Sequence, residues 1–179
     1  MGIGSGRMAA AVSSLMFGGV LIAGLFASHP APAQTVLQKA ERDEIAMVAK
    51  DDPTMAAAMS KARATLGDFL KIAAAPKPSM ANFAVKVAVH DGDQNEYFWI
   101  DPFTNDNGRF SGRINNKPEM VHTVKLGQTI TFARDEIVDW MYMDGGKMKG
   151  NYTACALLKS APKNEAEEFK ERFGLTCDF

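Results

Sequence analysis

Apolar residues recur at helical spacing early in the chain and then alternate with polar residues over a long central stretch. After Asp52, the positions that recur every three or four residues are Met55, Met59, Ala62, Leu66 and Phe69. This spacing predicts an amphipathic helix with one face on a core. Asp52-Pro53 favours its start, because aspartate caps helices and proline is tolerated at the first helical position. Pro76 and Pro78 end it.

Alternation of apolar and polar residues predicts several short strands downstream. In residues 82–90, Phe83, Val85, Val87 and Val89 share one face while Ala84, Lys86, Ala88 and His90 share the other, which is typical of a half-buried strand. Further strands are expected at 96–101, 109–114, around Ile130 and Phe132, and at 137–143, with a loop at 102–107. Asp144-Gly145-Gly146 predicts the tight turn of a hairpin.

The C-terminal part returns to helical character. Residues 152–159 satisfy neither period cleanly, and we interpret them as a helix, with a strand as the alternative. A final helix follows Pro162, with Asn164 as its cap and Gly174 as its end. The expected fold class is therefore α+β: an N-terminal helix packed on a twisted antiparallel sheet, which could be partly closed into a small barrel, with a C-terminal helix.

The first residues predict export. Arg7 precedes an apolar run that reaches Phe26, and Ala31-Pro32-Ala33 follows it. Residues 1–33 are therefore interpreted as a signal peptide; a retained membrane anchor is the alternative. Residues 34–51 are expected to be a helical linker and 52–179 a single α+β domain. The expected location is periplasmic or secreted, without stable membrane insertion after cleavage.

Charge, cysteine and histidine content limit the kinds of partner, disulfide and cofactor that the sequence predicts. Removing residues 1–33 takes away one arginine and no acid, which leaves 19 basic and 21 acidic side chains. With this balance the mature chain has no net positive charge that would attract nucleic acid. Cys155 and Cys177 could form a disulfide in an oxidising compartment, or be two unrelated thiols. His90 and His122 have no neighbouring Cys or His at ligand spacing, so neither a metal nor another cofactor is expected.

Candidate chemistry is concentrated between Arg134 and Thr153. Asp139 with Asp135 or Glu136 could act as the acid and base of a hydrolase. The alternative is a solvated turn and one acid at a strand edge. Alternation places Asp139 on the face of Ile137 and Met141, opposite Trp140.

Aromatic and amide side chains offer a second possibility. The candidate binding residues are Asp139, Trp140, Tyr142, Asn151 and Trp99. Aromatic side chains supply large contact area at binding sites, but they are also common core residues. Exposure of Trp140 distinguishes the two interpretations.

Most of the mature chain resembles one bacterial family. The resemblance runs through DPTMAAAMSKARATL, FAVKVAV, EYFWI, GRFSGRINNKP, VKLGQTITF and EIVDWMYMDGGKMKGNYT. With these blocks in this order, the chain is similar to domain-of-unknown-function family 2314, which includes YegJ-like exported proteins. The residues that resemble a shared family pattern are Asp139-Trp140, Gly146 and Gly150 to Thr153. The resemblance implies a small α+β domain and no established activity, so it supplies no catalytic residues.

Three functions are compatible with these features. The first is a non-enzymatic domain that binds a protein, peptide or envelope ligand through the surface around Trp140. The second is the hydrolase centred on Asp139. The third is a structural envelope protein, which is expected if Trp140 and Tyr142 are buried and no pocket exists.

Overall fold

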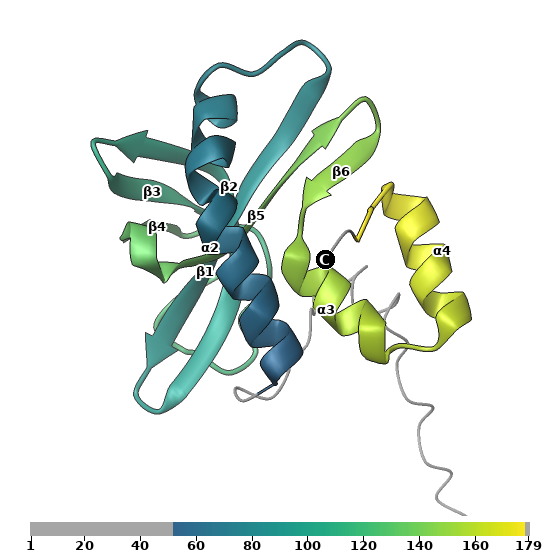
Figure 1. The fold of residues 1–179 in the computed structure, drawn as a ribbon. Helices are drawn as coiled ribbons and strands as arrows, with labels where there is room; N and C mark the ends of the chain where they lie inside the picture. Colours follow the sequence, from purple (N-terminus) through teal and green to yellow (C-terminus); the bar gives the residue numbers. More distant parts are fainter. Residues whose placement is uncertain (1–51, 178–179) are drawn as a thin grey trace, which may run out of the picture. The chain divides into compact units, whose positions relative to one another are not determined.

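A computed structural model describes residues 52–177 (Figure 1). The predicted signal peptide and helical linker lie outside these residues. The helices are α2 (Pro53–Ala74), α3 (Tyr152–Ser160) and α4 (Lys163–Phe173), with a short 3-10 helix η1 (Arg134–Glu136). The strands are β1 (Met80–Asp91), β2 (Gln94–Asp106), β3 (Arg109–Ile114), β4 (Thr129–Phe132), β5 (Ile137–Asp144) and β6 (Lys147–Gly150).

The six strands form one antiparallel sheet in the order β4-β3-β2-β1-β5-β6. The sheet is open, with β4 and β6 at its edges, so the α+β prediction is confirmed and the closed-barrel variant is not seen. Neighbouring strands in sequence are mostly neighbours in the sheet, except that β5 pairs with β1. This crossover places the Asp139-Trp140 pair on a strand that is paired on both sides, with β1 and with β6.

Helix α2 covers one face of the sheet (Figure 1). Asp52 caps it by accepting hydrogen bonds from the amides of Thr54 at 2.7 Å and Met55 at 3.2 Å. Its predicted apolar stripe is buried except for the half-buried Met59, and Leu66 and Phe69 join a cluster that includes Phe98. Burial of this stripe is the main force that holds α2 on the sheet.

A second apolar cluster joins α3, α4 and β6. Cys155, Leu158 and Phe169 pack with Met148, and Leu175 forms a parallel bridge to Met148. The interpretation of 152–159 as a helix is confirmed. The final helix starts at Lys163 after Pro162 rather than being capped by Asn164, and it ends before Gly174 as expected.

Two strands differ from the expectation. β2 continues through Pro102 to Asp106, where a loop was predicted. Proline is tolerated there because the β2–β3 register shifts between Ile100 and Phe103, so no ladder hydrogen bond requires its missing N–H. β1 is buried on both faces from Ala84 to Val87, because α2 lies on one side and a polar cluster around Lys86 occupies the other.

Candidate functional site

The five predicted binding residues are all buried in the domain. Asp139 has 0% of its surface exposed, and Trp140, whose exposure distinguishes a binding site from a core residue, has only 7%. Tyr142, Asn151 and Trp99 are also buried. The expectation of an exposed surface around Trp140 is therefore wrong. Helix α2 covers that ring, and a partner on the protein surface cannot reach it.

Asp139 holds the first turn of α3. Its carboxylate accepts hydrogen bonds from the amides of Trp140 at 2.8 Å, Tyr152 at 3.3 Å and Thr153 at 2.7 Å, and from the Thr153 hydroxyl at 2.7 Å. Asn151, the residue at the N-cap position, makes no capping hydrogen bond with its side chain. Amides at a helix start need acceptors, and Asp139 supplies them from a different element.

Lys86 completes this buried polar cluster. It is the register partner of Asp139 on β1, and its ammonium donates a hydrogen bond to the Thr153 hydroxyl at 2.7 Å. The same ammonium lies 4.7 Å from the centroid of the Trp99 ring. Trp99 therefore contacts a cation inside the domain.

Burial controls the electrostatics of the cluster. Desolvation raises the pKa of Asp139 above its ordinary value of 3.8, while the positive charge of Lys86 and the donors from Thr153 and Trp140 oppose this rise. Burial and the nearby Asp144 and Tyr152 also raise the pKa of Tyr142 above 10.0, so its phenol stays protonated at neutral pH.

Trp140 lies on the opposite face of the sheet from Asp139, as alternation predicted. Its indole N–H donates to the carbonyl of Ala62 on α2 at 3.0 Å, and its ring stacks on Phe69 at 4.9 Å between centroids. Ile137 shares this face, contrary to prediction. The β1–β5 register shifts between Lys86 and Val87, and the extra β5 residue moves Ile137 to the side of Trp140.

Gly150 allows β5 and α3 to approach closely. It has φ +76°, and a Cβ there would lie 2.5 Å from Cε3 of Trp140 and would also collide with the Trp140 carbonyl oxygen. Its neighbour Asn151 donates an amide hydrogen bond to that same carbonyl at 2.8 Å. The pattern from Asp139 to Thr153 thus describes a junction between β5, β6 and α3.

The other two candidate acids stand apart from this cluster. Asp135 is exposed in η1, and the Glu136 carboxylate accepts a hydrogen bond from the Ala133 amide at 2.6 Å. Glu136 lines a depression of about 320 Å³ at the β3–β4 edge, together with Arg109 and Thr131, and Asp139 does not line it. These contacts do not bring Asp139 and either acid to one accessible site.

The structure joins Cys155 and Cys177 in a disulfide, with their Cα atoms 5.6 Å apart. The bridge connects the buried face of α3 to the segment after α4. This confirms the paired alternative for the two cysteines.

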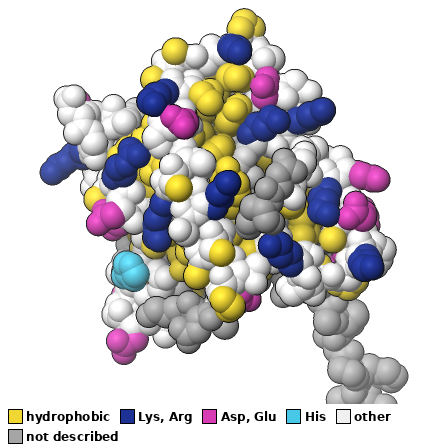
Figure 2. Space-filling model, in the orientation of Figure 1, with side chains coloured by type: hydrophobic (Ala, Val, Ile, Leu, Met, Phe, Trp, Pro, Cys, Tyr) yellow, Lys and Arg dark blue, Asp and Glu magenta, His cyan; other side chains and the backbone are white. Residues whose placement is uncertain are grey.

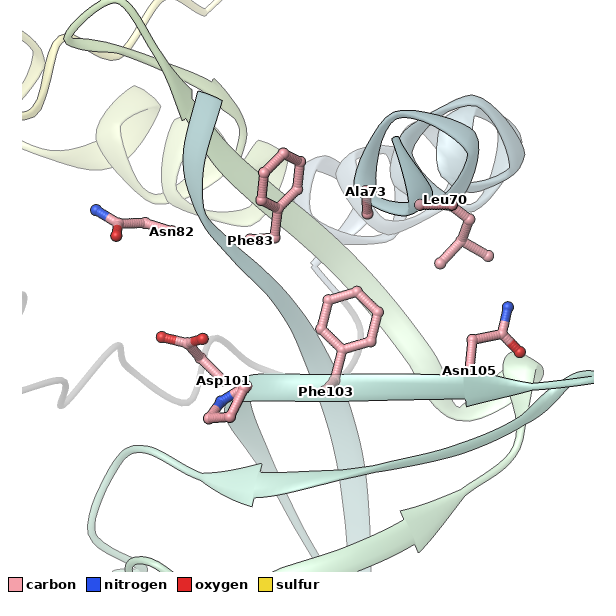
Figure 3. A pocket seen from close by; sticks show the side chains of 9 residues that line it. Leu70, Ala73, Asn82, Phe83, Asp101, Phe103 and Asn105 are labelled. Carbon is pink, nitrogen blue, oxygen red and sulfur yellow. The ribbon is translucent and has the colours of Figure 1, made fainter. Parts of the chain in front are cut away.

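A pocket of about 460 Å³ lies on the side of the sheet covered by α2 (Figure 3). β1 and β2 are paired as far as Val85 and Ile100, and beyond this pair each strand contains a register shift. One extra residue in each strand lets β1 follow β5 and β2 follow β3. The lining residues are Leu70, Ala73, Ala74, Asn82, Phe83, Asp101, Pro102, Phe103 and Asn105.

The walls of this pocket are of two kinds. Figure 3 shows Leu70, Phe83 and Phe103 around its apolar part and Asp101 and Asn82 at one end. Within residues 52–177, the side chains of Asp101 and Asn82 make no hydrogen bond or ion pair with one another or with any other residue. Asn82 also has φ +56°, an uncommon conformation for a residue other than glycine.

Sequence reasoning missed this pocket. Its signals are present but weak: Asn82 precedes an alternating run, and Pro102 interrupts another. Proline inside a strand marks an edge or a bulge, and here it marks a bulge. Nothing local indicates that two bulges in different strands lie side by side.

The rest of the described surface gives little further evidence about function. In the view of Figure 2, Lys and Arg side chains are scattered, with acidic side chains among them. Between residues 52 and 177, no His, Cys, Asp and Glu side chains gather in a group of three that could hold a metal ion. None of the helices described here is long and apolar enough to cross a membrane.

Comparisons with known proteins agree with the family resemblance. The family model described as "Uncharacterized protein conserved in bacteria (DUF2314)" matches residues 52–179. The uncharacterized protein YegJ of Escherichia coli (strain K12) is 36% identical over 122 residues, covering 68% of this chain and 78% of YegJ. No solved structure matches.

A putative ankyrin repeat protein of Neisseria meningitidis serogroup B, NMB1133/NMB1171, is 29% identical over 85 residues. The match covers 48% of this chain and 34% of that protein. The family match spans the whole described domain, including the Asp139 junction and the pocket. The chain therefore belongs to the DUF2314 family of uncharacterized bacterial proteins.

Proposed function

We propose that this protein is an exported, non-enzymatic binding domain whose ligand site is the pocket between α2 and the diverging strands β1 and β2. The pocket itself is the observation that carries the proposal. Its volume of about 460 Å³ is in the range that small ligands or single peptide side chains occupy. Its apolar walls with a few polar groups are also typical of binding sites.

The walls of the pocket are well supported. Two of the lining rings stack on core rings: Phe103 on Phe69, with 6.0 Å between centroids, and Phe83 on Tyr142, with 5.2 Å. These contacts tie the walls to the main core, where Phe69 also stacks on Trp140. A rigid site lowers the entropic cost of binding.

The proposed location is the periplasm or the extracellular space. The pattern of Arg7, an apolar run and Ala31-Pro32-Ala33 supports export. The Cys155–Cys177 disulfide supports it independently, because such bonds persist in oxidising compartments. Fractionation and N-terminal sequencing test this part: a periplasmic or secreted protein that begins at Gln34 is expected, whereas an uncleaved cytoplasmic protein contradicts it.

The hydrolase alternative has less support. It requires Asp139 and a second acid to reach a substrate, but Asp139 is fully buried and four donors occupy its oxygens. The structural-protein alternative agrees with buried Trp140 and Tyr142, but it requires that no pocket exist.

Two matched substitutions on α2 test the binding function. Ala73→Phe fills the pocket, whereas Ala64→Phe adds the same group on the exposed side of the helix. Wild-type protein and both variants are purified from bacterial envelope fractions, and retained molecules are identified by native mass spectrometry. Retention by wild type and Ala64→Phe, but not by Ala73→Phe, supports the proposal. Identical results for all three proteins contradict it and favour a structural role.

A further inference from the structure

We infer that the pocket binds a cation carried on an apolar group, such as the ammonium of an alkyl or aryl amine or of a peptide N-terminus. The inference rests on the proposed function and adds the chemical class of the ligand. It starts from the charge of the pocket: among the lining residues within 52–177, Asp101 is the only charged one.

Asp101 is available for a ligand. Its side chain is half-buried, and within residues 52–177 it makes no hydrogen bond or ion pair. A carboxylate beside apolar walls is less well solvated than one on an open surface, and a cation next to it is correspondingly favoured. An anionic ligand would be repelled by the same group.

The neighbouring side chains suit the rest of such a ligand. The ring of Phe103 lies between Asp101 at one end of the pocket and Leu70 at the other (Figure 3). Aromatic faces attract cations, and apolar side chains favour a hydrocarbon group. Asn82 lies at the same end as Asp101, and its exposed amide points outward from the apolar part of the pocket (Figure 3).

The probes for this inference are phenethylamine and 3-phenylpropionate, which differ mainly in the sign of their charge. Binding to the full chain is followed by the methyl NMR signals of Leu70 and Ala73 and by calorimetry. We expect saturable shifts with phenethylamine and none with 3-phenylpropionate. A tripeptide with N-terminal phenylalanine, compared with its N-acetylated form, distinguishes a peptide N-terminus from a free amine.

Substitutions test whether the Asp101 carboxylate is the group that binds the amine. Asp101→Asn is expected to weaken phenethylamine binding about tenfold or more, because it removes a charge-assisted contact. Asp106→Asn removes the same charge from an exposed position on β2 and is expected to change affinity little. If Asp101→Asn fails to fold, Ala74→Lys replaces it. A lysine at this exposed α2 residue brings a positive charge to the lining of the pocket, and it should weaken amine binding.

The outcomes separate this inference from the proposed function. Equal binding of the two probes overturns the inference that the ligand is a cation, and so does undiminished amine binding by Asp101→Asn, or by Ala74→Lys where Asp101→Asn does not fold. Either result leaves the proposed ligand pocket in place. If neither probe shifts Leu70 or Ala73 while Ala64→Phe still retains an envelope molecule that Ala73→Phe loses, the cationic class alone fails. If no molecule is retained either, both proposals fail.

Discussion

The carboxylate of Asp139 on β5 accepts a hydrogen bond from the amide of Thr153 on α3 at 2.7 Å, across 14 positions of sequence. This contact gives a structural reason for the segment that looked most like an active site. Asp139 and Thr153 fix the start of a helix, and Gly150 permits the approach. The polar side chains of Asp139 and Thr153 thus bond to other groups inside the domain. The pocket lies on the other face of the sheet.

Replacing Asp139 with alanine is expected to destabilise the protein by about 3–5 kcal/mol, because it leaves the buried Lys86 charge without its counter-charge and two α3 amides without acceptors. Urea unfolding followed by circular dichroism measures the change. Asp135→Ala is the control, since that exposed acid should contribute within about 0.5 kcal/mol. Equal effects of the two substitutions would refute the capping role.

Asp139 should also make stability depend on pH. Its pKa is raised above 3.8 in the folded protein, so the folded state holds this proton more tightly than the unfolded state. The contribution is fully present below the unfolded pKa and is lost as pH rises through the raised folded pKa. The free energy of unfolding of wild type minus that of Asp139→Asn should therefore fall across this window. A difference that is flat or rises with pH contradicts the assignment.

Gly150→Ala is expected to cost several kcal/mol more than Gly145→Ala. Both glycines have positive φ, so both substitutions carry a conformational penalty of about 1 kcal/mol. Only at Gly150 does the new Cβ also meet Trp140, whereas nothing lies within 4 Å at Gly145. Thermal unfolding of the two variants compares them directly, and similar melting temperatures would argue against the close approach.

Reduction of the Cys155–Cys177 disulfide should lower stability by about 3 kcal/mol, the value that chain entropy gives for a loop of this length. The bridge spans 22 positions and ties the C-terminal segment to α3. Unfolding in urea with and without reductant gives the difference. The double variant Cys155→Ser/Cys177→Ser should no longer respond to reductant. A wild-type curve that reductant leaves unchanged would contradict a stabilising bridge.

Much of the fold was predictable from local patterns. The cap at Asp52 with its apolar stripe defined α2, and alternation at 109–114 matched β3. These features depend on residues close in sequence. The hairpin at Asp144 was predicted for the same reason.

The candidate site depended on relationships that local patterns do not contain. Burial of Lys86 comes from contacts with Thr153, 67 positions away. The pocket comes from bulges near Asn82 and Asp101 on different strands. A bulge changes the strand period by one residue, so the alternation that predicts each strand cannot show where the strand leaves its neighbour.

The most direct test compares the two regions in one binding measurement. Retention of envelope molecules is measured for Ala73→Phe, which fills the pocket, and for Asp139→Asn, which alters the buried junction, at a temperature where both remain folded. Loss of retention in Ala73→Phe with retention preserved in Asp139→Asn is the predicted result. Preserved retention in Ala73→Phe with loss in Asp139→Asn would contradict it and return the functional site to the Asp139 segment.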